Sequence, residues 1–322
     1  MLFVNNFFEA LLKYDFLQRA LIASITVGIV CGLIGVFILL RSLIFMGEGI
    51  AHASFAGGAL GILIGINPFY TVFLFSAGSA MSIGYINEKG YIEDNNVAVG
   101  IIFALTMACG ILFVALIPSY NVAVYAFLFG NVLIVTTEDL IILILISIMI
   151  ICVLYFMKKE LFFITFDEQM ARATGLPVRL MLYLFLLLIS LTIVISLKAI
   201  GAILVFAMIV TPAAAAYQWS YSLNKILYLS VLFGCISSFI GLYLSFVLNF
   251  PSGSTITIVV SIIFVISMIF SPKRRGGKEI GFEHSCKECE KAAVEEECNI
   301  CSEHADHGYA NTLHDKFDQN KD

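Results

Sequence analysis

The sequence predicts an all-α membrane protein, a polytopic transmembrane bundle of about nine helices. Of its 322 residues, 60% are apolar and 13% are charged, whereas about a quarter of the residues in a soluble domain are charged. The apolar residues form runs of about 20, the length that crosses a bilayer as a helix. Nothing in the sequence alternates as a barrel strand would, so helices must satisfy the backbone within lipid.

The apolar runs define the expected spans. They cover residues 16–40, 47–66, 70–87, 97–117, 139–157, 178–197, 200–218, 226–248 and 254–270. The run 121–134 is too short to span and is expected to lie along one face of the bundle. Residues 1–15 carry no signal-peptide pattern and are expected to form an amphipathic helix at the membrane interface.

Basic residues predict the orientation. With the N-terminus outside, the inner side holds Arg41, Lys89, Lys158, Lys159, Arg172, Arg179, Lys225 and a basic run over 273–278. The outer side holds only Lys13, Arg19 and Lys198. The positive-inside rule therefore places the C-terminus and the loop 158–177 in the cytoplasm. Three regions follow: the interfacial helix 1–15, a transmembrane domain 16–272 and an acidic tail 273–322.

The pattern MGEGIAHAS places two ionisable residues, Glu48 and His52, in the second apolar run. Residues four apart share one face of a helix, and a carboxylate within a span is costly enough that it tends to be functional. Carboxylate oxygen and imidazole nitrogen suit a divalent Zn, Mn or Fe ion. The alternative is that Glu48 caps its helix near the headgroups, with His52 hydrogen-bonded nearby.

The loop 158–177 contains a short amphipathic segment, Phe166 to Thr174, which Gly175 and Pro177 bring to an end. We expect a short helix there that docks a cytoplasmic partner. The alternative is a connector that lies on the surface.

The tail contains a second candidate metal site. Its possible ligands are Cys286, Cys289, Cys298, Cys301, His304 and His307. Two CxxC steps can complete a tetrahedral site, and a cytosolic location disfavours disulfides. The tail is therefore expected to bind metal, with zinc preferred by thiolates.

Several enzyme motifs are missing from the sequence. It has no GxxxxGKS or GxxxxGKT phosphate loop, so the chain is not expected to hydrolyse ATP by that route. It contains neither a Ser/His/Asp pattern nor the HExxH motif of zinc proteases. We expect a non-catalytic protein that requires no cofactor and binds no nucleic acid.

Six motifs follow one another along residues 16–272: CGLIGVFILLRSLIFMGEGIAHASFAGGALG, NNVAVGIIF, FLFGNVLIVTTEDL, FDEQMARATGLPVRL, IGAILVFAMIVTPAAAAY and FPSGSTI. In content and order they resemble the permease subunits of ATP-binding-cassette importers for zinc and manganese, of the ABC-3 type. The resemblance implies a trimmed form of the vitamin B12-importer fold in the plasma membrane. The Cys/His tail is not part of the family's usual pattern.

The resemblance also implies partners and residue roles. Such permeases form homodimers on two cytoplasmic ATPase subunits, and an extracellular solute-binding protein delivers the metal. Glu48 matches a position that is usually aspartate, and His52 matches a histidine on the translocation path. Phe166–Gly175 would be the coupling helix that contacts the ATPase, with Phe166, Asp167, Ala171 and Gly175 as its candidate residues.

The expected function is therefore import of a divalent transition metal by alternating access. Zinc is favoured over manganese or iron because of the thiolates in the tail. Two alternatives stay open. A gradient-driven secondary metal transporter would be expected to carry more intramembrane carboxylates and inverted repeats, and a membrane-anchored metal sensor would act through its tail.

Overall fold

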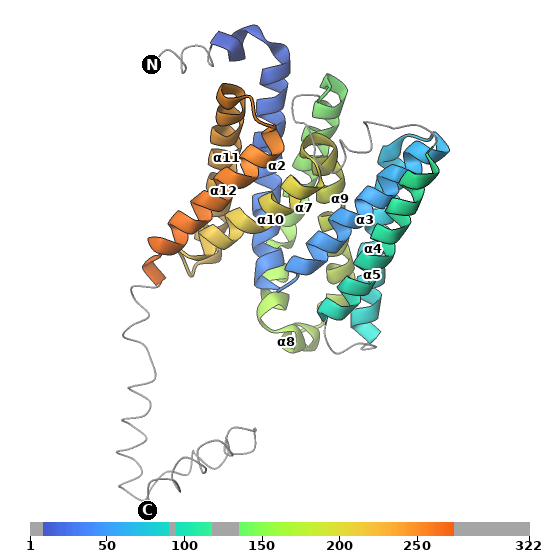
Figure 1. Ribbon diagram of the computed structural model, residues 1–322. Helices are drawn as coiled ribbons and strands as arrows, with labels where there is room; N and C mark the ends of the chain where they lie inside the picture. The colour runs from blue at the N-terminus through green and yellow to red at the C-terminus, as the bar shows by residue number, and fades with distance from the viewer. Residues whose placement is uncertain (1–8, 90–94, 118–134, 274–322) are drawn as a thin grey trace, which may run out of the picture. The chain divides into compact units, whose positions relative to one another are not determined.

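The computed structural model describes residues 9–89, 95–117 and 135–273 (Figure 1). The chain divides into two units, Met1–Ser271 and Pro272–Asp322, and the helices named here belong to the first. The described residues contain no strand, which confirms the all-α class. The helices are α2 (Asp15–Leu40), α3 (Ile44–Ile64), α4 (Pro68–Lys89), α5 (Asn95–Leu116), α7 (Thr137–Phe166), α8 (Glu168–Ala173), α9 (Val178–Ile200), α10 (Ala202–Tyr217), α11 (Leu223–Leu248) and α12 (Ser252–Ile269).

The helices lie close to the predicted spans. Eight helices in the described part of the chain are long and apolar enough to cross a membrane, and they match every predicted span except 200–218. That run forms α10, which has 16 residues, or about 24 Å of helix against a hydrocarbon core of about 30 Å. Helix α7 is longer than predicted and continues to Phe166, because charged residues end an apolar run without ending a helix.

Helix α2 packs against α7, α10 and α11. Small residues let these helices approach closely. A Cβ added to Gly28 of α2 would lie 2.9 Å from the backbone oxygen of Gly234 in α11. One turn away, the hydroxyl of Ser230 donates a hydrogen bond to the backbone oxygen of Gly32 at 2.8 Å. The glycines of α2 therefore serve close helix packing.

Helices α3, α4 and α5 form a second packed group (Figure 1). A Cβ added to Gly57 of α3 would lie 2.5 Å from the backbone oxygen of Thr71 in α4. Helix α9 contacts α3 and α4 on one side and α2 and α7 on the other, so it joins the two groups. As a result α3, the helix that carries Glu48 and His52, is packed on several sides.

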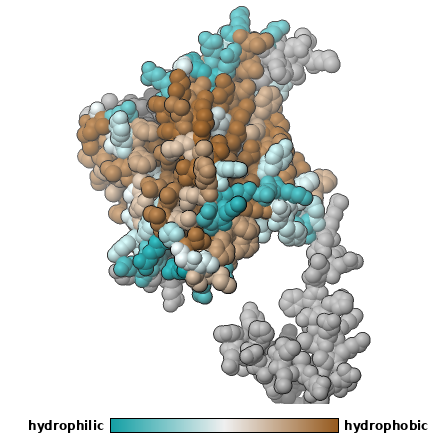
Figure 2. Space-filling view, turned by 180° about the vertical axis from the view of Figure 1, so that it is seen from behind, coloured by the Kyte–Doolittle hydropathy of each residue, from teal (hydrophilic) through white to brown (hydrophobic). Residues whose placement is uncertain are grey.

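Large apolar side chains are exposed along the outer faces of the helices. Examples are Ile101, Leu105 and Leu112 in α5 and Leu145 and Ile148 in α7. Figure 2 shows one such face from behind, where hydrophobic residues cover most of the surface and hydrophilic residues gather towards its ends. Apolar surface of this extent is unusual for a protein in water, and it fits contact with lipid.

Some predictions fall wholly or partly outside the described residues. Of the interfacial helix predicted over 1–15, residues 9–15 are described and 9–13 are helical. The run 121–134 lies outside the described residues, as do Cys286, Cys289, Cys298, Cys301, His304 and His307 of the tail. The surface-lying run and the metal-binding tail therefore stay predictions.

Candidate functional site

Glu48 and His52 lie in the first half of α3, on one face of the helix. Both residues are half-buried. A Cβ added to Gly49 would lie 3.1 Å from the side chain of Val99 in α5, whereas one added to Gly47 would meet nothing within 4 Å. Gly49 therefore serves helix packing, and the open space beside Glu48 lies at Gly47.

The imidazole of His52 packs against an aromatic ring of a neighbouring helix. It lies edge-on to Phe103 of α5, with ring centroids 4.9 Å apart and planes at 88°. The Nδ1 atom of His52 is buried and has no hydrogen-bond partner among the described residues. Buried polar atoms are normally hydrogen-bonded, so this nitrogen is left for water or for a bound ion.

The geometry argues against the alternative that Glu48 caps its helix. Helix α3 begins at Ile44, and its N-cap is Leu43, whose side chain makes no cap hydrogen bond. Glu48 lies a full turn later, beyond the four N–H groups that a cap would satisfy. The carboxylate is therefore placed within the helix rather than at its end.

One chain supplies only part of the coordination shell of a metal ion. Among the described residues, no group of three or more His, Cys, Asp or Glu side chains is placed to hold an ion. Glu48 and His52 offer one carboxylate and one imidazole, a donor pair that first-row divalent cations accept. A complete site needs further donors from water, from the backbone or from another copy of the chain.

The loop after α7 folds as a short helix, but the prediction that this helix begins at Phe166 is wrong. Helix α8 spans Glu168–Ala173, and Phe166 is the last residue of α7. Asp167 separates the two helices because its backbone is extended, with φ −148° and ψ 94°. Its carboxylate accepts a hydrogen bond from the N–H of Met170 at 2.8 Å and so caps α8.

The other residues predicted in this loop differ in their surroundings. Ala171 is fully buried in a small apolar cluster with Val178. Gly175 follows the helix with a φ of +81°, the left-handed conformation that commonly ends a helix. Phe166 and Met170 are 70% and 54% exposed. This end of the bundle therefore exposes large apolar side chains beside the short helix.

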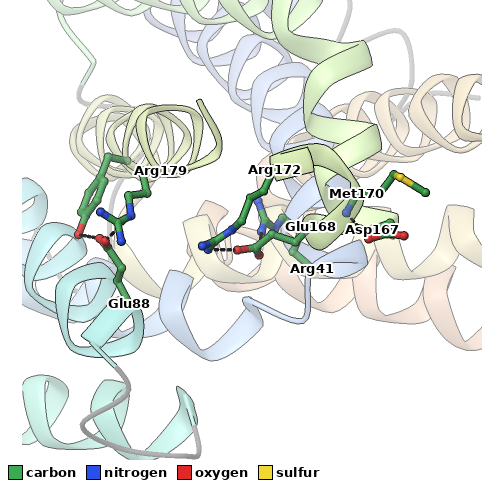
Figure 3. A network of polar contacts seen from close by, with 8 residues as sticks. Arg41, Glu88, Asp167, Glu168, Met170, Arg172 and Arg179 are labelled. Atoms are coloured by element: carbon green, nitrogen blue, oxygen red, sulfur yellow. Dashed lines mark hydrogen bonds and ion pairs between the residues drawn. The ribbon is translucent and has the colours of Figure 1, made fainter. Parts of the chain in front are cut away.

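Charged side chains that sequence reasoning did not identify as a site lie in α8 and beside it (Figure 3). The Glu168 carboxylate lies 2.6 Å from the guanidinium of Arg172 and 3.6 Å from that of Arg41, which directly follows α2. A third ion pair, 2.7 Å long, joins Arg179 of α9 to Glu88 of α4. All five residues line a cavity of about 270 Å³. Most of these partners lie far apart in the sequence, so no local pattern indicates the network.

A family model described as the ABC 3 transport family matches residues 13–271. The chain belongs to the ABC 3 transport family. The matched region includes Glu48, His52, α8 and the charged network, and it ends before the Cys/His tail. This match confirms the resemblance drawn from the six motifs.

Relatives and a solved structure extend the comparison for this ABC 3 family chain. It is 42% identical to the manganese transport system membrane protein MntC of Listeria innocua. The aligned 268 residues cover 83% of this chain and 95% of the relative. It is 34% identical to the manganese import system permease protein ScaB of Streptococcus parasanguinis, over 87% of this chain and 100% of the relative. The structure of PsaBC from Streptococcus pneumoniae in complex with Fab matches with a TM-score of 0.77 at 36% identity, over 84% of this chain and 98% of that chain.

Proposed function

We propose that the chain is the permease subunit of an ATP-binding-cassette importer for a divalent transition metal. One observation carries the proposal: Glu48 and His52 share one face of a membrane-spanning helix, and the buried Nδ1 atom of His52 has no hydrogen-bond partner in the part of the chain that the structure describes. Ionisable side chains within spans are costly and mark ion pathways. The subunit itself is non-catalytic, and separate partner subunits hydrolyse ATP.

Manganese is the first metal that we propose. The relatives MntC and ScaB are named for manganese, and a carboxylate donor such as Glu48 suits Mn²⁺. The preference for zinc, drawn from the thiolates of the tail, gains no support from these names. Zinc stands second because imidazole suits it, and because a metal bound by the tail need not be the cargo.

The site is proposed to be completed by a second copy of the chain. Each copy would bring one carboxylate and one imidazole, and two copies together would bring four protein donors. A transport site must bind its ion weakly enough to release it. A shell divided between two copies meets this requirement, because movement of the copies apart would open it.

Helix α8 is proposed to be the coupling helix that docks on the ATPase subunit. The exposed Phe166 and Met170 offer apolar contacts beside it. Asp167 and Gly175 set where the helix begins and ends, and Ala171 packs it onto the bundle. By the placement of lysine and arginine, this end and the C-terminus face the cytoplasm, and the opposite end receives the metal from an extracellular solute-binding protein.

Membership of an ABC transport family favours ATP-driven import over a gradient-driven carrier and over a sensor. The tail lies beyond the family match. We propose for it an accessory role in binding zinc, separate from transport through the spans.

A metal-resolved uptake assay in a strain that lacks the gene tests this function. The wild-type chain is expected to restore manganese uptake. The combined Glu48→Gln and His52→Ala change is expected to lower uptake at least about tenfold, because both donors are lost. Glu138→Gln, an exposed carboxylate in the first turn of α7, is the matched control and should leave uptake unchanged.

Co-purification of the ATPase subunit shows whether the variant complexes assemble. Normal uptake by the assembled double variant would contradict the proposed site. Restoration of zinc uptake without manganese uptake would overturn the choice of metal and keep the rest of the proposal.

A further inference from the structure

An ion pair connects α8 to the corner between α2 and α3. The guanidinium of Arg41, in that corner, lies 3.6 Å from the carboxylate of Glu168 in the first turn of α8 (Figure 3). The two residues are far apart in the sequence, and they belong to different elements of the bundle. Glu168 also pairs with Arg172, but that contact lies within α8 and spans one helical turn. Of these two contacts, the one with Arg41 links α8 to another part of the molecule.

The side chain of Arg41 is largely buried in this position, with only 11% of it exposed. Burial lowers the pKa of the guanidinium below its usual value, and the Glu168 carboxylate offsets part of this shift. A second terminal nitrogen, Nη1, is buried without a hydrogen-bond partner among the described residues. A buried cation without a counter-charge is costly. A displacement of Glu168 would therefore tend to bring Arg41 with it.

The corner that contains Arg41 is tight and leads directly into α3. Ser42 takes a left-handed conformation with φ 56°, which is uncommon for a residue with a side chain. The N–H of Leu43 then donates a hydrogen bond to the backbone oxygen of Ile38 at 2.9 Å. Helix α3 begins directly after Leu43, at Ile44, and Glu48 lies within its second turn. Movement of the corner would therefore be passed to the helix that carries the metal donors.

We infer that Arg41 is a positioning residue, which transmits the movement of α8 through the corner of α2 and α3 to Glu48 and His52. The inference rests on the proposed function, in which α8 docks on the ATPase. It adds the route inside the permease. A displacement of Glu168 moves Arg41 through their ion pair, and movement of Arg41 shifts the start of α3. Arg41 itself touches neither the ion nor, with a side chain so deeply buried, an extended surface of the partner.

Arg179 provides a control in the same cavity, with a side chain that is 71% exposed against 11% for Arg41. Arg179 also forms an ion pair between two elements, with Glu88, and it lines the same cavity as Arg41. Its pair joins α9 to α4 and does not include α8. Arg179→Gln removes the same charge as Arg41→Gln from the same region, but it leaves the link between α8 and α3 intact.

The test uses the full complex of permease, ATPase subunits and solute-binding protein, reconstituted in proteoliposomes. Manganese is added outside the vesicles. The measured quantity is the metal taken up per ATP hydrolysed. Arg41→Gln is expected to lower this ratio about fivefold while ATP hydrolysis and co-purification of the ATPase persist. Arg41→Lys should restore most of the ratio, because it keeps the charge, and Arg179→Gln should stay close to wild type.

Glu168→Gln removes the other partner of the ion pair, from a more exposed position, and should lower the same ratio. It replaces Arg41→Gln as the test if the Arg41→Gln complex does not assemble. An unchanged ratio in the assembled Arg41→Gln complex, or equal losses in Arg41→Gln and Arg179→Gln, would overturn the inference alone. Absence of metal uptake by the wild-type complex would overturn the proposed function, and the inference with it.

Discussion

At the scale of single residues, His52 combines a packed ring with a buried nitrogen that has no partner among the described residues. The edge-on contact with Phe103 holds the plane of the imidazole, and no described residue forms a hydrogen bond with its Nδ1 atom. The open space at Gly47 lies beside Glu48. Side chains that are positioned by packing and not by hydrogen bonds can bind an ion without first breaking protein contacts.

Two substitutions of Glu48 test the length of its side chain and its charge separately. Glu48→Asp keeps the negative charge and shortens the side chain by one methylene group. We expect uptake to persist, with the manganese concentration at half-maximal uptake shifted by about tenfold or less, because the donor type is kept. Glu48→Gln, which keeps the length and removes the charge, should lose much more. Initial uptake rates over a range of manganese concentrations distinguish the two, and equal losses would show that length matters as much as charge.

At the scale of elements, close contacts of small residues set the positions of the helices. Gly28 of α2 and Gly234 of α11 face each other, so that a Cβ on either would lie within 3 Å of the other's backbone oxygen. In lipid the apolar chains of the bilayer compete equally well for apolar surface, so packing of this kind holds helices together. The α2–α11 contact therefore depends on the absence of side chains.

Substitution of Gly234 by alanine is expected to force α2 and α11 apart. The new Cβ would lie 2.6 Å from the backbone oxygen of Gly28, and overpacking of this kind costs about 1–3 kcal/mol. Thermal unfolding of the purified protein in detergent should show a lower melting temperature. Gly78→Ala in α4 is the control, since a Cβ there meets nothing within 4 Å and alanine favours helix by about 0.5–1 kcal/mol. A similar loss in both variants would contradict the packing argument.

At the scale of the whole molecule, one chain provides a permease framework, and the ion site that we propose in it is incomplete. Helix α9 joins the two groups of packed helices, so a movement at α8, just before α9 in the sequence, can reach both. No group of three or more His, Cys, Asp or Glu side chains among the described residues is placed to hold an ion, so the site proposed at Glu48 and His52 needs further donors. Completion of the site by a second copy would make transport a property of the pair.

Mixed dimers test whether two copies share one site. Two differently tagged chains are co-expressed, one of them carrying Glu48→Gln and His52→Ala, and the mixed pair is isolated by two affinity steps. A shared site predicts uptake far below half of wild type in the reconstituted mixed dimer, because every site contains one damaged half. Independent sites predict about half of wild type, one intact site in each symmetric pair. The second result would overturn the shared site and keep the transport function.

The class of the protein and most of its helices could be predicted from sequence because the bilayer imposes a simple rule. Each span needs about 20 apolar residues, and helices α2, α3 and α9 follow the predicted runs closely. The rule does not predict where helices end outside the lipid, as at the end of α7 and the start of α8. Helix α7 continues past the charged residues Lys158, Lys159 and Glu160 to Phe166. Asp167, by its backbone conformation and its cap, decides where α8 begins.

The sequence by itself determined the membrane class, the spans and the pairing of Glu48 with His52, because these depend on composition and on spacing within one helix. Only the tertiary structure decided what surrounds them. The contact of His52 with Phe103, the unpaired Nδ1 atom and the ion pair of Arg41 with Glu168 each join elements distant in the chain. Contacts of that kind depend on how helices pack against one another, and no local pattern in the sequence records that packing.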